Sequence, residues 1–230
     1  MLYENYKSVE AKARAACERA GRNFEDITII AVSKTKPLSD IEALVSHGIT
    51  EYGENKVQEL CDKYDTVSRP VHWHLIGHLQ TNKVKYIVDK TCMIHSVDSI
   101  HLAQAIEKEA AKKDVIVNVL LQVNIAQEDT KFGTTEQGVY ELIDAIKDFP
   151  HIHVNGLMTI APFVENPEEN RPHFKKMYQL LLDIKSKCID NIDMNVLSMG
   201  MTNDYEIAIE EGATMIRVGT AIFGNRNYNI

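Results

Sequence analysis

The segment ITIIAVSK, residues 27–34, is apolar for almost its whole length and ends in a lysine. An apolar run without alternation is typical of a strand that is covered on both faces, as in a parallel sheet enclosed by helices. Seven further short runs, rich in β-branched and aromatic residues, follow it: residues 50–55, 72–77, 93–98, 118–125, 154–160, 195–200 and 215–224. We therefore predict eight strands.

Segments with helical periodicity lie between many of these runs, at residues 39–48, 99–113, 135–149 and 168–187. Strands that alternate with helices indicate parallel crossovers. Eight such units in a chain of 230 residues favour an α/β fold, a single (β/α)₈ TIM barrel domain over residues 1–230. An open doubly wound sheet is the alternative.

The two ends of the chain differ in a way that suits a barrel. Apolar residues recur at helical spacing from Leu2 to Ala20, and Gly21 follows, so the pattern predicts an N-terminal helix that ends near Ala20. After the eighth predicted strand only NRNYNI, residues 225–230, remains, which is too short for a barrel helix. We expect the N-terminal helix to replace the last barrel helix.

The charge balance limits the classes of partner. The chain has 33 acidic and 25 basic residues and a formal net charge of −8, which disfavours a non-specific grip on nucleic acid. Its four cysteines form no C-x-x-C pair, and neither a signal peptide nor a membrane span is predicted. We expect a cytoplasmic protein that binds neither nucleic acid nor membranes.

Lys34 is the first candidate for chemistry, because the functional groups of such barrels lie at the carboxyl ends of the strands. Burial and the like charge of Lys36 would favour a neutral amine on Lys34, which can attack an aldehyde to form a Schiff base. The alternative is that both lysines extend into solvent.

Arg217 lies in MIRVGTAIF, residues 215–223, a run with no other charge. Its guanidinium must therefore find an acceptor or face a polar cavity in the barrel. If the aldehyde that binds Lys34 is pyridoxal 5′-phosphate (PLP), an arginine beside its ring nitrogen would keep that nitrogen unprotonated, because arginine can only donate hydrogen bonds. A structural salt bridge to a strand carboxylate explains the residue equally well.

The loops after the seventh and eighth predicted strands read SMGMTND (198–204) and GTAIFG (219–224). Gly200 and Gly219 would let backbone amides approach a phosphate, and Ser198 and Thr220 could donate hydroxyl hydrogen bonds. Neither a P-loop nor a G-x-G-x-x-G motif occurs, so a nucleotide site is not indicated.

The histidines of HWHLIGH, residues 72–78, raise the alternative of a metal-dependent hydrolase. His72 and His74 would project from one face of a strand, but they precede its apolar part and so lie away from the carboxyl end. We expect hydrogen-bonded histidines and no metal site. His151 and His153 are predicted to precede the sixth strand.

Six motifs, in order and at consistent spacing, carry a resemblance over nearly the whole chain. They are AVSKTKP (31–37), YGENKVQE (52–59), WHLIGHLQTNK (73–83), GLMTI (156–160), LSMGMTNDYEIAI (197–209) and IRVGTAIFG (216–224). With them the sequence closely resembles the pyridoxal phosphate homeostasis protein family, which is of the alanine racemase N-terminal barrel type.

The resemblance implies PLP as the cofactor, held as a Schiff base on Lys34, with Arg217 facing the ring nitrogen. It also implies Asn55 near the cofactor, and these residues around the phosphate: Ser198, Gly200, Met201, Gly219 and Thr220. Two positions depart from the family pattern, since Lys56 stands where tyrosine is common and Thr202 where serine is more usual.

Members of this family are regarded as regulators of vitamin B6 balance without established catalytic turnover. We therefore expect a monomeric PLP carrier with PLP-dependent apoenzymes as partners. The alternative is a small PLP-dependent racemase or lyase. Related racemases obtain a second base from a tyrosine helped by an additional β-domain and a partner subunit, whereas this sequence ends at the barrel.

Overall fold

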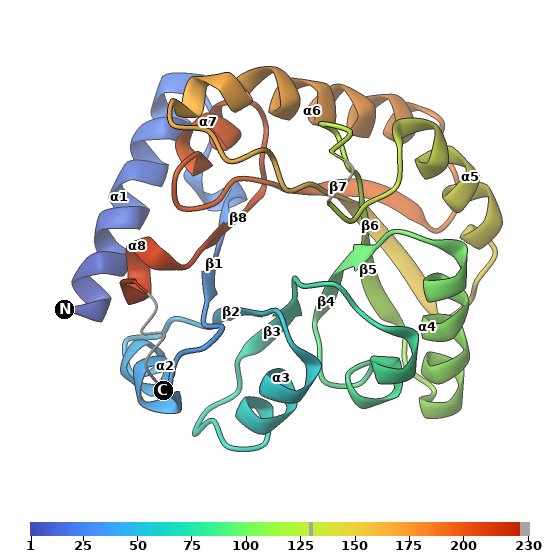
Figure 1. The fold of residues 1–230 in the computed structure, drawn as a ribbon, viewed down its shortest axis with the longest axis horizontal. Helices are drawn as coiled ribbons and strands as arrows, with labels where there is room; N and C mark the ends of the chain where they lie inside the picture. The colour runs from blue at the N-terminus through green and yellow to red at the C-terminus, as the bar shows by residue number, and fades with distance from the viewer. Residues whose placement is uncertain (129–130, 226–230) are drawn as a thin grey trace.

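The computed structural model describes residues 1–128 and 131–225, and its eight parallel strands form a closed barrel in sequence order (Figure 1). The barrel prediction is confirmed, and the open sheet is wrong. The strands are β1 (Thr28–Val32), β2 (Glu51–Glu54), β3 (His72–Leu75), β4 (Met93–Val97), β5 (Val117–Gln122), β6 (Ile152–Met158), β7 (Ile192–Ser198) and β8 (Met215–Val218).

Helices surround the strands, as Figure 1 shows. They are α1 (Leu2–Ala20), α2 (Leu38–Val45), α3 (Val57–Tyr64), α4 (Ile100–Lys113), α5 (Glu136–Ile146), α6 (Arg171–Ser186), α7 (Tyr205–Glu210) and α8 (Thr220–Phe223). Three short 3₁₀ helices add to them: η1 (Phe24–Asp26), η2 (Thr81–Tyr86) and η3 (Pro167–Asn170). In the described part of the chain, none of these helices has the length and apolar character that a membrane span requires.

The side chains of β1 show why an apolar run becomes a barrel strand. Ile29 and Ala31 join the large core between strands and helices, while Ile30 points into the barrel and lies beside Gly53 of β2. Both faces are therefore buried, as the unbroken apolar pattern requires. The interior holds its own small apolar cluster of Met93, Leu120 and Met158.

Helix α1 closes the seam of the barrel, as predicted. It ends at Ala20, and Gly21 caps it in the left-handed conformation with a φ of 64°. Its buried face carries Val9, Ala13, Ala16 and Cys17. Asn5 donates a hydrogen bond of 2.9 Å to the Ile222 carbonyl of α8, so the first and last described helices are joined directly.

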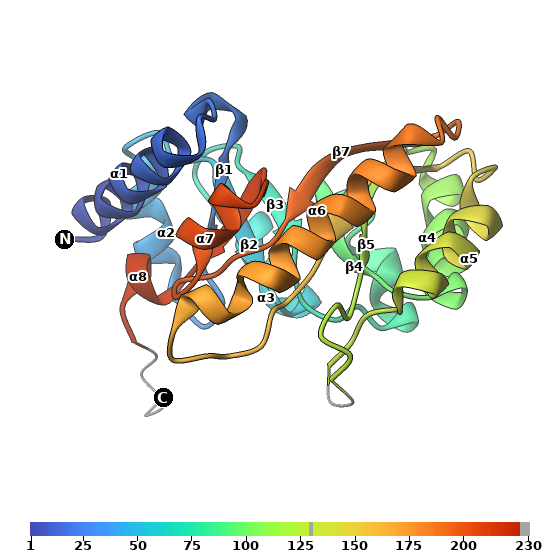
Figure 2. The same ribbon diagram turned by 90° about the horizontal axis from the view of Figure 1, so that it is seen from above.

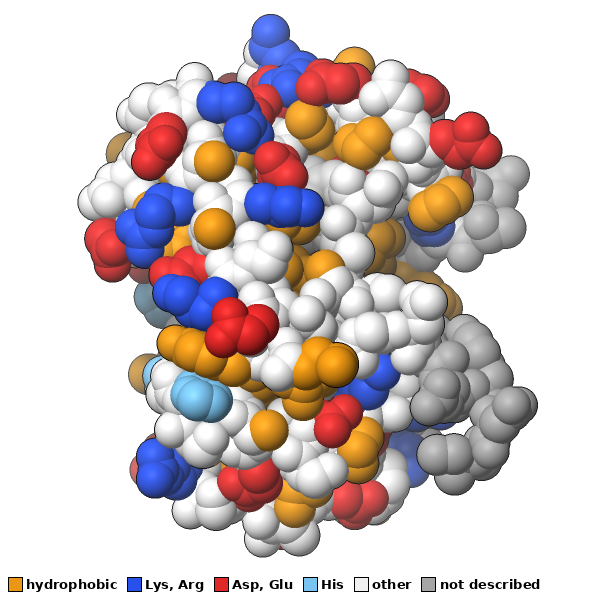
Figure 3. Space-filling model, turned by 90° about the vertical axis from the view of Figure 1, so that its left-hand side faces the viewer, with side chains coloured by type: hydrophobic (Ala, Val, Ile, Leu, Met, Phe, Trp, Pro, Cys, Tyr) orange, Lys and Arg blue, Asp and Glu red, His pale blue; other side chains and the backbone are white. Residues whose placement is uncertain are grey.

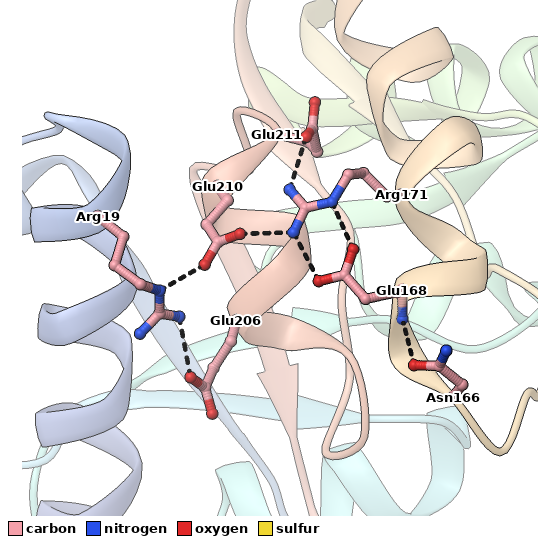
Figure 4. A network of polar contacts seen from close by, with 7 residues as sticks. All are labelled: Arg19, Asn166, Glu168, Arg171, Glu206, Glu210 and Glu211. Carbon is pink, nitrogen blue, oxygen red and sulfur yellow. Dashed lines mark hydrogen bonds and ion pairs between the residues drawn. The ribbon is translucent and has the colours of Figure 1, made fainter.

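Ion pairs join α1 to α7 on the outer surface of the barrel (Figure 4). Arg19 of α1 contacts Glu206 and Glu210 of α7, and Glu210 also contacts Arg171 at the start of α6. Arg171 is held by two further carboxylates, Glu168 and Glu211. A shared network of this kind holds its side chains better than isolated surface pairs do. Figure 3 shows positive and negative side chains next to one another on this side of the molecule.

Two predicted strand boundaries need correction. The eighth strand was expected to reach residue 224, but β8 ends at Val218 and the one-turn helix α8 follows. His153 was expected to precede the sixth strand, but it lies within β6 and pairs with Asp193 of β7 at 3.0 Å. Polar, partly exposed residues alternate with buried ones at the start of β6, which hides that part of the strand from a search for apolar runs. Of NRNYNI, residues 226–230 lie outside the described residues.

Gly156 offers a test of how tightly β6 and β7 pack. A Cβ at this position would lie 1.8 Å from the Val196 carbonyl oxygen, which belongs to rigid strand backbone. Gly156→Ala should therefore lower the free energy of unfolding by about 1–3 kcal/mol. Urea unfolding followed by the fluorescence of the single, buried Trp73 measures the change. In Gly219→Ala the added Cβ meets nothing closer than 3.5 Å, so this control should unfold like the parent chain.

Candidate functional site

Lys34 follows β1 in a short turn at the carboxyl end of the barrel. It is two residues beyond the end of the strand, whose residue Ile30 lies inside the barrel beside Gly53. The next residue, Thr35, has a φ of 62°, an uncommon and strained value for a β-branched residue. The turn that carries the lysine therefore needs support from its surroundings.

A buried ion-pair cluster supplies that support. Lys63 of α3, 7% exposed, contacts Glu54 and Glu59 at 2.7 Å each and donates to the Ser33 carbonyl at 2.8 Å. Glu59 accepts a hydrogen bond of 2.6 Å from the Thr35 amide. The cluster thus holds the backbone on both sides of Lys34, and sequence reasoning missed all three of its charged residues.

Glu54 is the most deeply placed member of this cluster. Burial raises the pKa of its carboxyl, although Lys63 and the Ser33 hydroxyl, which donates to Glu54 at 2.6 Å, act in the opposite direction. The second carboxylate oxygen, Oε2, has no hydrogen-bond partner among the residues that the structure describes. The stability of the Glu54 charge therefore depends on Lys63.

Lys36 has a different environment from Lys34. Its ammonium donates to three carbonyl oxygens at the end of α8, those of Phe223, Gly224 and Asn225, at 2.9, 3.3 and 3.1 Å. A lysine that caps a helix C-terminus in this way has a structural role. The alternative that both lysines simply extend into solvent is therefore wrong for Lys36.

Arg217 lies inside the barrel on β8, paired in register with Ile30 of β1. It is 4% exposed and donates to the Ser198 hydroxyl at 2.5 Å and to the Thr159 carbonyl at 2.8 Å. Within residues 1–128 and 131–225 no carboxylate forms an ion pair with it, so the structural salt bridge weighed above is not found there. Burial lowers its pKa to about 10, which still leaves it positively charged at neutral pH.

Ser198 lies beneath the loop that follows β7 rather than in it. Its side chain is fully buried and bonds both Arg217 and His95 of β4, the latter at 3.0 Å. His95 continues inward to His74 of β3 at 2.9 Å. Complete burial, aided by the charges of His74 and Arg217, lowers the pKa of His95 well below its usual value, so this imidazole is neutral. The signal in the sequence that could have located His95 is its place within the otherwise largely apolar run MIHSV, residues 93–97.

The loops after β7 and β8 lie next to each other. Gly200 has a φ of 88°, and its carbonyl accepts a 3.0 Å hydrogen bond from the Arg217 amide. Met201 is exposed, and the Thr202 hydroxyl is 3.5 Å from the Ala221 amide at the start of α8. Gly219 and Thr220 begin that turn. The structure thus brings both predicted phosphate loops together, and Thr202 offers a hydroxyl between them.

Asn55 borders a cavity of about 610 Å³, which lies beside the mouth of the barrel between α3 and η2. Lys56, His78 and Lys83 also line it. The His78 ring stacks on Phe132 of the loop after β5, with ring centroids 3.9 Å apart. Figure 2 shows the loops after β5 and β6 projecting beyond the same end of the barrel as α8.

Comparisons with known proteins agree with this architecture. Residues 5–227 match the model of the family described as alanine racemase, N-terminal domain. The chain is 42% identical over 226 residues to a pyridoxal phosphate homeostasis protein of Aquifex aeolicus, with 98% of each chain covered.

Two solved structures are also similar. PipY of Synechococcus elongatus, determined with PLP bound, has a TM-score of 0.84 at 29% identity, covering 97% of this chain and 100% of PipY. An alanine racemase of Clostridium difficile shares the fold, with a TM-score of 0.75 at 15% identity, covering 99% of this chain and 57% of the racemase.

Removal of Lys63 tests the support of the lysine turn. Lys63→Met leaves Glu54 buried without its cation, so the free energy of unfolding should fall by about 3–5 kcal/mol. Lys90→Met is the matched control, because Lys90 pairs with Asp65 at the surface and its loss should cost less than about 1 kcal/mol. Urea unfolding of both variants gives the comparison, and equal losses would contradict a supporting role for Lys63.

Proposed function

The chain belongs to the pyridoxal phosphate homeostasis protein family, and from this premise we propose that it binds PLP at the carboxyl end of its barrel. In this proposal the cofactor is held as a Schiff base on Lys34, and the protein acts as a carrier in vitamin B6 homeostasis without catalytic turnover. The similarity to PipY, which was solved with PLP bound, supports the choice of cofactor.

The buried charge of Arg217 carries the proposal. A guanidinium that has only donors and no carboxylate partner among the described residues calls for an acceptor nearby. The unprotonated nitrogen of a pyridine ring is such an acceptor, and the phosphate brings further negative charge to this end of the barrel. The residues present therefore fit PLP.

The two lysines of the β1 turn divide their roles in this proposal. Lys36 caps the end of α8, and Lys34 follows β1, the strand that pairs with β8 and its Arg217. The cluster of Glu54, Glu59 and Lys63 fixes the turn, so the amine of Lys34 starts from a defined backbone position.

The phosphate would be held between the two glycine-containing loops, by backbone around Gly200, Met201, Gly219 and Thr220. Ser198 would contribute indirectly, because its hydroxyl accepts a hydrogen bond from Arg217 and so sets the position of the guanidinium. Thr202 is an additional candidate for a hydroxyl contact. Asn55 would border the cofactor on the side of the 610 Å³ cavity.

A carrier role fits this electrostatic environment better than racemisation does. Bound PLP supplies an aldehyde and an electron-accepting ring, and the ring accepts electrons best when its nitrogen is protonated. Arg217 cannot accept a hydrogen bond and so disfavours that protonation. The relatives of Aquifex aeolicus and Pseudomonas aeruginosa, which match over nearly their full length, are named as homeostasis proteins rather than as enzymes. We propose PLP-dependent apoenzymes as partners, and a monomer in the cytoplasm as the working form.

Reduction with borohydride tests the lysine assignment. The parent protein, mixed with PLP and reduced, should carry one cofactor per chain, and peptide mapping should find it on Lys34. Lys34→Ala should lose both the Schiff-base absorption and the modification, whereas the neighbouring Lys36→Ala should keep both. Modification of Lys36 in the parent protein would overturn the assignment. Loss of optical activity from single L-amino acids would instead favour the racemase alternative.

Gly219→Ala tests the phosphate loop separately from stability. Without a ligand the new Cβ has room, since its nearest neighbour is 3.5 Å away. If the backbone at Gly219 faces the phosphate, the methyl group should weaken PLP binding tenfold or more, about 1.4 kcal/mol. Titration of PLP by absorption measures the affinity, and an unchanged dissociation constant would move the phosphate elsewhere.

A further inference from the structure

Three potential metal ligands converge at the amino end of the barrel, opposite to the proposed cofactor site. Glu51 begins β2, His74 lies in β3, and Cys92 directly precedes β4, so the three come from neighbouring strands. Their ligand atoms all lie within 4.8 Å of one another. Sequence reasoning paired His72 with His74 but did not bring Cys92 to them.

A fourth residue extends the group toward solvent. The Glu51 carboxylate bridges the two histidines, with Oε1 2.5 Å from His72 Nδ1 and Oε2 2.8 Å from His74 Nε2. The His74 side chain is 3% exposed, whereas that of His72 is 64% exposed. An ion could therefore enter from solvent past His72 and reach ligands that are largely sheltered.

We propose that Glu51, His74 and Cys92 form a binding site for a divalent transition-metal ion of the zinc class. The combination of carboxylate oxygen, imidazole nitrogen and thiolate sulfur is the donor set that Zn²⁺ takes, and His72 or a water molecule completes four-coordination. Tetrahedral zinc places its ligand atoms roughly 3.3–3.8 Å apart, given its usual bond lengths. The present spread of up to 4.8 Å requires a contraction of about 1 Å, within reach of side-chain adjustment.

His95 supports the site from inside the barrel. Metal-bound histidines are normally oriented by a hydrogen bond to their second ring nitrogen. His74 Nδ1 already has such a partner in the fully buried His95, at 2.9 Å, so Nε2 is directed toward Glu51 and Cys92. This orienting contact is the feature that a chance group of surface side chains lacks.

The position of the site indicates a structural or regulatory ion rather than a catalytic one, because chemistry in this fold lies at the opposite end of the strands. Cys92 carries a free thiol and must bind as thiolate. An ion on His74 Nε2 leaves the ring proton on Nδ1, which faces His95 Nε2 at 2.9 Å. Each ion bound therefore forms the metal–sulfur bond and releases one proton, from Cys92, to the buffer.

Equilibrium dialysis of the full chain against Zn²⁺, with metal content measured by elemental analysis, tests the proposal. We expect one ion per chain, a raised thermal midpoint, and one proton released, measured by calorimetry in buffers of different ionisation enthalpy. Co²⁺ should give a thiolate-to-metal absorption band. None of these readouts depends on bound PLP.

Matched cysteine variants decide whether the ion occupies this site. Cys92→Ser should abolish the cobalt band and weaken Zn²⁺ binding at least 100-fold, while Cys188→Ser, which changes an exposed thiol, should bind like the parent chain. His74→Gln should also lose binding. If His74→Gln fails to fold, Cys92→Ser alone decides the test. Unchanged binding in Cys92→Ser, or no binding by the parent chain, would overturn the proposal.

Discussion

A buried arginine that no described carboxylate neutralises governs the interior of this barrel. Arg217 of β8 is paired in register with the apolar Ile30 of β1. Its guanidinium donates hydrogen bonds to the Ser198 hydroxyl and the Thr159 carbonyl. Taking a charge out of water is costly unless acceptors replace the lost hydration. The polar interior is therefore best understood as a set of acceptors arranged around one cation, to which the pyridine nitrogen of PLP would add another.

The hydrogen bonds that begin at Arg217 run through the whole depth of the barrel. They connect Glu51 to His74, His74 to His95 and His95 to Ser198, and the Ser198 hydroxyl accepts from Arg217. Burial alone would raise the pKa of Glu51, but the hydrogen bonds from His74 and His72 outweigh burial and lower it. A metal ion on His74 Nε2 would leave the His74 ring proton on Nδ1, from which it is donated to His95. The proposed metal site is thus physically connected to the residue that faces the proposed cofactor.

The sequence predicted the features that depend on neighbouring residues and missed those that depend on contacts between residues far apart in the chain. The unbroken apolar run of β1 and the glycine that ends α1 are local signals, so the barrel and its closing helix were predictable. The start of β6 was not, because its alternating polar residues resemble a loop. Nor was the support of Lys34, since Lys63 reaches the Ser33 carbonyl from 30 residues away and nothing local indicates that contact. Gathering Glu51, His74 and Cys92 likewise requires the strand order and register.

The two lysines of the β1 turn differ in their backbone surroundings, which the sequence does not show. Both stand within two residues of each other, and each could extend into solvent. What separates them is the strained conformation at Thr35, which the Glu59 carboxylate stabilises by accepting the Thr35 amide proton. Lys36 follows this positive φ and reaches the carbonyl oxygens of α8, whereas Lys34 precedes it, two residues after the end of β1. Strain that costs of order 1–3 kcal/mol persists only where the surroundings hold it. Here Glu59 binds the Thr35 amide, and Lys63, which pairs with Glu59, binds the Ser33 carbonyl on the other side of the proposed site of attachment.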